Sequence, residues 1–284
     1  MTPTERYASR VAAFEQMRDR WRGHQPADRW SGGIAEQAGA DPRRELDENL
    51  KALAAFVQPD DVLLDVGGGA GRISLPLALR CREVIVVDPS PAMRTSFQTA
   101  ATRAGIGNVN YVQSVWPPAT ELSADVLLTA HVTYFVDDIV PFLTALDRLA
   151  RRRVIVSIWT VPPPMMGSAV YELVYGVPTE APPGHRELLP VLWDMDITPD
   201  VHVLPTPMRQ NYVWQPQPTR EQMLERSVQV LQWQGHVDVA RARGLIDQHF
   251  DELFVHTRGG YLPHWPDNVR EMLITWEPRH TWDL

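Results

Sequence analysis

An acidic residue followed by a run of glycines is the part of this sequence that points most directly to chemistry. In the stretch DVGGGAG, Asp65 is followed by Gly67, Gly68, Gly69 and Gly71. Glycines let a backbone turn sharply and approach a ligand, because no Cβ stands in the way. A carboxylate within an apolar run is costly unless hydrogen-bond donors reach it. The stretch therefore predicts a ligand-binding loop with a functional acid at its start.

The glycine spacing separates two classes of ligand. A dinucleotide-binding loop has the pattern G-x-G-x-x-G, in which the third glycine lets a helix pack closely on a strand. Counted from Gly67 and Gly69, the third position is Arg72, and counted from Gly69 and Gly71 it is Ser74. Neither register matches, so a nicotinamide-dependent oxidoreductase is the less favoured alternative.

A second acid follows at the spacing of a ribose-binding residue. Asp88 ends the β-branched run 84–87, some twenty positions after Gly67, which is where an acid at the end of a second strand meets ribose hydroxyls. A carboxylate accepts hydrogen bonds from both hydroxyls. The alternative is that Asp88 only starts the turn before Pro89. We expect the ribose role because position and chemistry agree.

The elements that must position these residues alternate between strands and helices. Short apolar runs typical of buried strands lie at 62–66, 84–87, 109–112, 125–130 and 154–159. Helical patterns separate them, and two more, at 3–22 and from 42 onward, precede them. This alternation over about a hundred residues predicts a doubly wound parallel sheet.

The segment from about 42 to 160 resembles the class I S-adenosylmethionine-dependent methyltransferases. The resemblance lies in D-x-G-x-G-x-G from Asp65 to Gly71, in the acid that ends strand two, and in the polar end of strand three. It implies a Rossmann-like, mainly parallel seven-stranded sheet whose last strand is antiparallel. It also implies S-adenosylmethionine as cofactor, S-adenosylhomocysteine as product, and in-line methyl transfer to a nucleophilic atom. We assign the last two strands to 201–204 and 271–276.

The resemblance and the helical pattern of the remaining chain together predict three segments of one structural domain. Residues 1–58 form an N-terminal helical cap, and 59–160 form the Rossmann-like, cofactor-binding core. Residues 161–284 complete the sheet and carry a helical insertion at about 215–255 that caps the substrate.

Contacts to the cofactor follow from the same resemblance. They are Asp65, Gly67, Gly68, Gly69, Gly71, Asp88, Pro89, Met93, Gln113, Ser114, Val115, Trp116, Ala130 and His131. The loop 113–116, expected to hold the adenine, contains no acid. Gln113 or Ser114 would offer polar contacts, and Trp116 would offer a stacking face or, alternatively, a hydrophobic plug.

Fewer residues are predicted to bind the substrate or to act on it. His131 follows the fourth strand and is the expected catalytic base if the nucleophile loses a proton, because histidine titrates near neutrality. The alternative is a structural hydrogen-bonding role. Trp30, Tyr134 and Trp159 are the expected substrate contacts, with core packing as their alternative role. Without an evident base, a cofactor-binding regulatory or scaffold module stays open.

Composition limits the partners. The 284 residues have 44% hydrophobic and 22% charged content, as in an ordinary soluble globule, and a net charge of −8, which argues against nucleic acid. The single cysteine, Cys81, excludes an internal disulfide and fits the cytoplasm. We expect no signal peptide, membrane span or metal site, a small-molecule substrate, and a monomer or homodimer.

Overall fold

A seven-stranded sheet forms the centre of the computed structural model, which describes residues 1–21, 28, 30–31, 33–119, 122–207, 213–265 and 269–279. The strand order is β3-β2-β1-β4-β5-β9-β6. Their bounds are β1 Val62–Val66, β2 Glu83–Val87, β3 Val109–Val112, β4 Ala124–Ala130, β5 Ala150–Trp159, β6 Asp200–Pro207 and β9 Arg270–Trp276. Within the described sheet, β9 runs in the opposite direction to the other six strands. The predicted fold class is confirmed.

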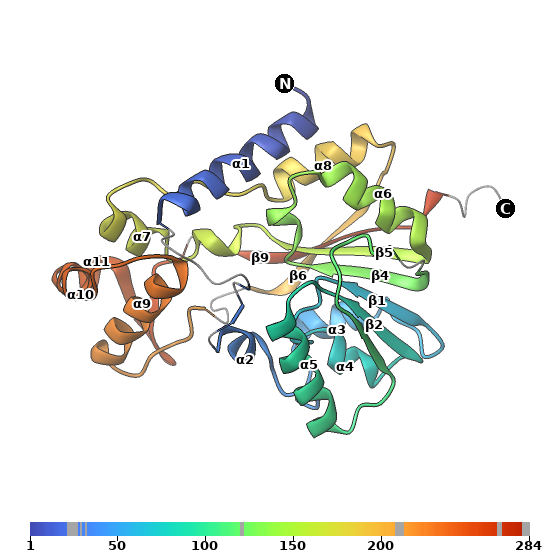
Figure 1. The fold of residues 1–284 in the computed structure, drawn as a ribbon, viewed down its shortest axis with the longest axis horizontal. Helices are drawn as coiled ribbons and strands as arrows, with labels where there is room; N and C mark the ends of the chain where they lie inside the picture. Colours follow the sequence, from blue (N-terminus) through green and yellow to red (C-terminus); the bar gives the residue numbers. More distant parts are fainter. Residues whose placement is uncertain are drawn as a thin grey trace.

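Helices cover both faces of the sheet (Figure 1). On one face α1 (Pro3–Trp21), α6 (Ile139–Leu149) and α8 (His185–Asp194) bury their apolar sides against the strands. On the other face lie α3 (Glu48–Ala54), α4 (Ser74–Ala78) and α5 (Pro91–Ala104). The central strands β1, β4, β5 and β9 are largely buried on both faces, which explains their continuous apolar runs.

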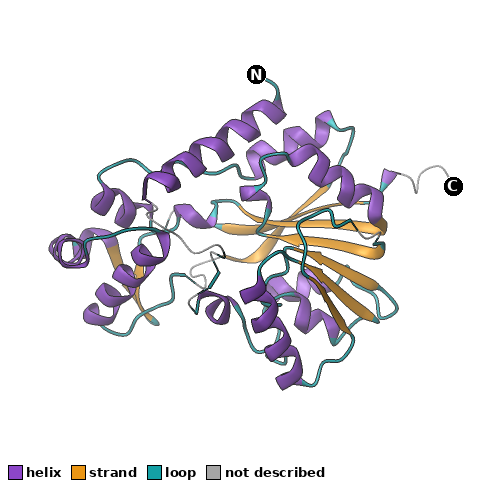
Figure 2. Ribbon diagram, in the orientation of Figure 1, coloured by secondary structure: helices purple, strands orange, loops and turns teal. Residues whose placement is uncertain are grey.

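A second hydrophobic cluster lies beside the sheet and forms a lobe (Figure 2). The lobe contains α7 (Ser168–Tyr175), α9 (Arg220–Gln234), α10 (Val239–Gln248), α11 (Phe250–Leu253) and the hairpin of β7 (Phe254–Thr257) and β8 (Gly260–Pro263). The end of α1 is part of the same cluster through Phe14, Met17 and Trp21. One helix thus ties the lobe to the sheet.

Two local predictions were wrong in detail. The helix expected from Pro42 begins at Glu48, where the Asp47 side chain accepts a hydrogen bond from Leu50 N at 2.8 Å and caps it. The helical insertion expected at about 215–255 ends at Leu253, and the hairpin of β7 and β8 follows it. Phe254 packs in the lobe core either way, so its apolar character did not distinguish helix from strand.

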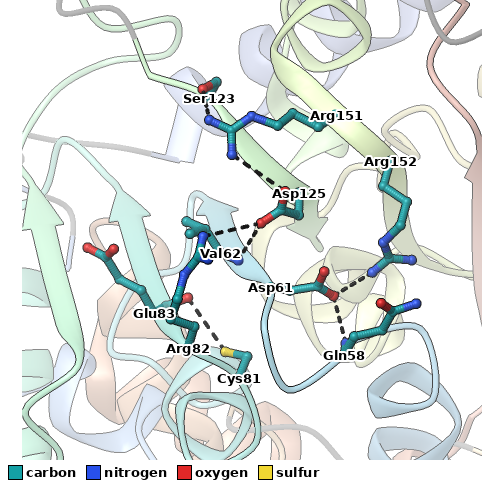
Figure 3. Close-up of polar contacts among 10 residues, drawn as sticks. All are labelled: Gln58, Asp61, Val62, Cys81, Arg82, Glu83, Ser123, Asp125, Arg151 and Arg152. Carbon is teal, nitrogen blue, oxygen red and sulfur yellow. Dashed lines mark hydrogen bonds and ion pairs between the residues drawn. The ribbon is translucent and has the colours of Figure 1, made fainter.

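Ion pairs hold the strand ends opposite the glycine loop (Figure 3). Arg152 on β5 contacts the buried Asp61, which also accepts a hydrogen bond from Gln58 N at 2.6 Å. Arg151, whose side chain is 54% exposed, lies 3.4 Å from Asp125. The arginines at the start of β5 are therefore engaged in structural pairs.

Replacing Arg152 by Met is expected to lower the free energy of unfolding by about 1–3 kcal/mol, because the buried Asp61 carboxylate loses its charged partner. Arg151→Met is the matched control and should change it by less than about 1 kcal/mol, since that pair is exposed to solvent. Urea unfolding of both variants measures the difference, and equal effects would contradict the structural role of Arg152.

Candidate active site

A cavity of about 400 Å³ opens at the carboxyl ends of β1, β2 and β4. Open α/β sheets bind their ligands at this edge. The glycine loop and Asp88 line one end of the cavity. Aromatic residues from α1, β5 and the lobe line the other end: Phe14, Trp21, Trp159, Tyr171, Trp214 and Trp233. One cavity thus joins a polar end to an aromatic end.

Asp65 is a buried acid at the polar end. It lies on β1 between β2 and β4, and only 2% of its surface is exposed. Burial raises the pKa of its carboxyl to about 7, and the charge of Asp88 adds to the rise. Its Oδ1 has no hydrogen-bond partner within the described part of the chain. A buried carboxylate oxygen with no partner, beside a cavity, is suited to a cationic ligand group.

Asp88 ties the glycine loop to α5. Its Oδ2 accepts a hydrogen bond from Gly69 N at 3.1 Å, and its Oδ1 accepts one from Ser90 N at 2.9 Å. Ser90 in turn caps α5 by accepting from Met93 N at 3.0 Å. Asp28, which the sequence did not single out, accepts from Ser90 Oγ at 2.9 Å. Asp88, Pro89 and Met93 line the cavity.

The glycines of the loop have two different roles. Gly67, Gly68 and Gly69 line the cavity. Gly71 does not line it, and its contact with the cofactor stays a prediction. A Cβ at Gly71 would lie 2.6 Å from Leu75 Cγ and 2.7 Å from Phe97 Cδ2. Gly71 therefore lets the turn pack on the protein core.

The loop 113–116 does not line this cavity, and its adenine contacts stay a prediction. Gln113 accepts a hydrogen bond from Arg94 at 3.3 Å, and Ser114 Oγ donates to the carbonyl of the exposed Val115 at 2.9 Å. The Trp116 indole donates to Phe142 O at 3.3 Å and packs against the core. Its alternative role as a hydrophobic plug fits the structure.

His131 forms a polar pair with a residue that the sequence did not indicate. Its Nε2 lies 3.2 Å from Glu271 Oε1, which also accepts a hydrogen bond from Ser157 Oγ at 2.5 Å. Glu271 Oε2 accepts from Asn49 at 3.3 Å. Burial by itself would raise the pKa of Glu271, but the hydrogen bond and charge of His131, with smaller contributions from Ser157 and Arg72, lower it to about 2.

Strand register explains this pair. Glu271 on β9 lies opposite Trp159 on β5, and Ser157 on β5 lies opposite Ala130, which precedes His131. His131 has a φ of 62°, a left-handed conformation that is uncommon for a residue with a side chain. Both Ala130 and His131 line the cavity. The only sequence signal for Glu271 was an acid at the start of an apolar strand.

Of the three residues predicted to contact substrate, two line the cavity and one does not. Trp30 and Trp159 line the cavity, whereas Tyr134 does not. Tyr134 is fully buried, and its hydroxyl oxygen accepts a hydrogen bond from Trp159 N at 2.6 Å, so its predicted contact with substrate is corrected to a structural one. The indole nitrogens of Trp21 and Trp159 are buried donors without a partner among the described residues. Both lie on the cavity.

Neither a metal site nor a membrane helix is found in the described ranges. No group of three or more His, Cys, Asp or Glu side chains there is arranged to hold a metal ion. No helix there is long and apolar enough to cross a membrane.

Comparison with known proteins agrees with this geometry. Residues 64–158 match the family model described as a methyltransferase domain. The structure of the YcgJ protein of Bacillus subtilis has a TM-score of 0.52 at 14% identity, covering 81% of this chain and 98% of that one. Magnesium protoporphyrin IX methyltransferase of Synechocystis, with bound S-adenosylhomocysteine, has a TM-score of 0.46 at 19% identity, covering 70% and 90%. No curated protein matches the sequence significantly.

The sheet order, the glycine loop and the cavity at the strand ends define a Rossmann-like class I methyltransferase fold. The matched methyltransferase domain, residues 64–158, is the part of this fold that carries the glycine loop and Asp88.

Proposed function

We propose that this enzyme methylates a nucleophilic atom of a small molecule held at the aromatic end of the cavity. The observation that carries the proposal is the continuity of that end with the glycine loop, Asp65 and Asp88 in one cavity. The proposed cofactor, S-adenosylmethionine, supplies an electrophilic methyl group on its sulfonium. The protein aligns the two reactants and excludes water, and positioning alone supplies several kcal/mol.

The residues that would hold the cofactor lie at the polar end. Asp65 Oδ1 has no partner within the described ranges, and the Asp65 carboxylate would pair with the ammonium group of S-adenosylmethionine. The loop from Gly67 to Gly69 brings backbone close to the same space. Asp88, held by two backbone donors, would accept hydrogen bonds from the ribose hydroxyls through its carboxylate. Pro89, Met93, Ala130 and His131 complete that wall.

The lobe and the N-terminal helix would cover the substrate. Residues of α1, α7 and α9 line the aromatic end, and all three elements belong to one hydrophobic cluster. A net charge of −8 favours a small molecule over nucleic acid. The single, buried cysteine supports a cytoplasmic location, and a monomer or homodimer stays a prediction.

Calorimetry and a transfer assay test the proposal. Titration with S-adenosylmethionine, S-adenosylhomocysteine and NADH should give heats of binding for the first two only. Methyl transfer from labelled cofactor into a metabolite extract separates an enzyme from a non-catalytic module. Tight cofactor binding with no labelled product across the extract would overturn the catalytic role.

Asp88→Asn is expected to weaken binding of S-adenosylmethionine about 30- to 150-fold, corresponding to the loss of about 2–3 kcal/mol of charge-assisted hydrogen bonding. Calorimetric dissociation constants measure the effect. Asp60→Asn, on an exposed turn before β1, makes the same chemical change outside the cavity and should leave affinity unchanged. An unaltered dissociation constant for Asp88→Asn would remove Asp88 from the cofactor site.

A further inference from the structure

Arg18 brings a charge to the aromatic end of the cavity. It lies on α1, lines the cavity, and has a side chain that is 11% exposed. The other charged residues that line the described cavity are Asp65, Arg72 and Asp88. The two acids belong to the polar end, and Arg72, directly after the glycine loop, lowers the pKa of Asp65 and so lies near it. Within the described ranges, the aromatic end thus has one permanently charged side chain, and its charge is positive.

Two phenylalanine rings hold the guanidinium group of Arg18 at this end. Its Cζ atom lies 5.4 Å from the ring centre of Phe14 and 5.9 Å from that of Phe135. Both rings line the cavity, one from α1 and the other from the turn after β4. A cation over the face of an aromatic ring is stabilised electrostatically, whereas the guanidinium N–H groups point outward in its own plane. The rings therefore fix the position of the charge and leave its edges for hydrogen bonds.

The one hydrogen bond that Arg18 makes to the described part of the chain does not satisfy this group. Nη1 donates to Glu15 Oε1 at 2.9 Å, and a guanidinium has five N–H donors. Glu15 does not line the cavity, and its side chain is 35% exposed. The alternative role of the pair is to support the helix, but such an i,i+3 pair contributes little. A largely buried cation is costly unless it is paired and hydrogen-bonded. An anionic group of the substrate would complete its bonding.

The remaining donors and the apolar walls favour a carboxylate over other anions. Its planar pair of oxygens accepts two parallel hydrogen bonds from one guanidinium. It carries a single negative charge, equal and opposite to that of Arg18, whereas a phosphate monoester carries up to about two. Removing a second charge from water, against walls of phenylalanine and tryptophan, would add a cost that Arg18 does not offset. The same walls suit a flat, ring-containing body for the rest of the molecule.

We propose that the substrate is a carboxylic acid with a flat, ring-containing body, and that Arg18 binds its carboxylate as an anchor. The inference rests on the proposed methyl transfer and names its substrate class. The carboxylate is not the methylated group, because hydrogen bonds from a guanidinium stabilise its ionised form and make its oxygens less basic and poorer nucleophiles. The atom that accepts the methyl group lies elsewhere on the body, and the product is still an acid.

The first test determines the charge of the methylated product. The protein is incubated with 13C-methyl S-adenosylmethionine and a metabolite extract, and the products are separated on an anion exchanger at pH 7 before mass spectrometry. We expect a labelled acid whose carboxyl group still couples to an amine with a carbodiimide. A labelled methyl ester of that carboxyl group, or a labelled product without a carboxyl group, would overturn the inference and leave methyl transfer intact. Absence of any labelled product would instead overturn the proposed function.

The second test compares Arg18→Met with Arg20→Met over a dilution series of the same extract. Arg18→Met keeps an apolar stem but removes the charge, so half-maximal labelling should need about 10- to 100-fold more extract, while the rate at saturation changes less. Arg20 is exposed on the same helix and does not line the cavity, so Arg20→Met should match the wild type. Calorimetry with S-adenosylhomocysteine should give equal affinities in all three proteins. An unchanged dilution curve for Arg18→Met would overturn the anchor.

Two further variants keep the inference testable if Arg18→Met does not fold. Glu15 accepts a hydrogen bond from Arg18 and would repel a substrate carboxylate, so Glu15→Gln should lower the extract needed for half-maximal labelling about two- to fivefold. Arg18→Lys keeps the charge but loses the planar fork, and its curve should lie between those of the wild type and Arg18→Met. A curve that moves in neither of these variants would overturn the role of Arg18.

The third test uses two defined probes, 2-naphthoate and 2-naphthamide, which share one ring body and differ in charge. Each is added to the labelling reaction of the wild type at an extract concentration below saturation. The naphthoate should inhibit labelling at a concentration about tenfold or more below that of the naphthamide, and in Arg18→Met the two should inhibit alike. Equal inhibition in the wild type, or no inhibition by either probe, would overturn the proposed substrate class.

Discussion

Asp65→Asn is expected to stabilise the cofactor-free protein and, in the same variant, to weaken cofactor binding. Burial raises the pKa of Asp65 from 3.8 to about 7. Between these two values the folded protein holds a proton that the unfolded chain has lost. The free energy of unfolding therefore falls as pH rises through this window. Above the window it is lower than below it by at most about 4 kcal/mol. Asn removes this cost because it has no charge to bury.

Binding is expected to change in the opposite sense. The ammonium group of S-adenosylmethionine would pair with the ionised carboxylate, so wild-type affinity should rise as pH increases through about 7. In Asp65→Asn the affinity should be lower above pH 7 by about 1.5–3 kcal/mol, and nearly independent of pH in this range. A residue under such a trade-off is one that function retains at the expense of stability.

Two measurements on the same samples check this pair of effects. Urea unfolding between pH 5 and 8 should show a falling free energy for the wild type and a flatter line for Asp65→Asn. Calorimetry over the same range gives the affinities. Asp60→Asn, exposed in the turn before β1, should resemble the wild type in both. Equal cofactor affinity in wild type and Asp65→Asn at pH 8 would exclude the ammonium contact.

Gly71→Ala is expected to destabilise the fold by about 3 kcal/mol or more. The added Cβ would lie 2.6 Å from Leu75 Cγ and 2.7 Å from Phe97 Cδ2, both in the core, and a φ of 79° adds strain of about 1–2 kcal/mol. The turn has no room to relax, because Leu75 is fully buried and Phe97 is 1% exposed.

Gly69→Ala is the matched variant and should separate folding from binding. Its Cβ would first meet Met93 Sδ at 3.4 Å, so the cost is mainly the strain of a φ of 54° at about 1–2 kcal/mol. The added methyl group would stand at the cavity, and cofactor affinity should fall tenfold or more. Urea unfolding and calorimetry measure the two effects. If Gly69→Ala lowers the free energy of unfolding more than Gly71→Ala does, the assignment of Gly69 to the cavity and of Gly71 to the core is wrong.

Local signals in the chain predicted most of the sheet and the polar end of the site. Buried strands have continuous apolar runs, and their order with the helices implied a doubly wound sheet with the acids at its carboxyl edge. Asp65, Gly69 and Asp88 lie together at the cavity for this reason. Each of these residues lies on, or directly after, a strand or turn that is recognisable in the sequence. Their spacing along the chain was therefore sufficient to place them at this edge.

Spacing along the chain was least informative for residues whose surroundings depend on tertiary packing. Gly71 and Gly69 belong to one pattern, but Leu75 and Phe97 decide that the first faces the core. Trp116 was placed by the position of its loop, whereas its ring is held by Phe142 on α6. Tyr134 follows a strand that ends at the cavity, yet its hydroxyl is bonded to Trp159 N. Side-chain direction in such loops depends on packing.

By itself, the sequence determined the sheet, the glycine loop and the two acids, because strand periodicity, glycine spacing and β-strand length are local properties. Only the tertiary structure decided what His131 can do. The antiparallel β9 inserts between β5 and β6 and brings Glu271 opposite Trp159, beside the histidine that follows β4. Non-local strand pairing made this neighbourhood, and no spacing along the chain records it.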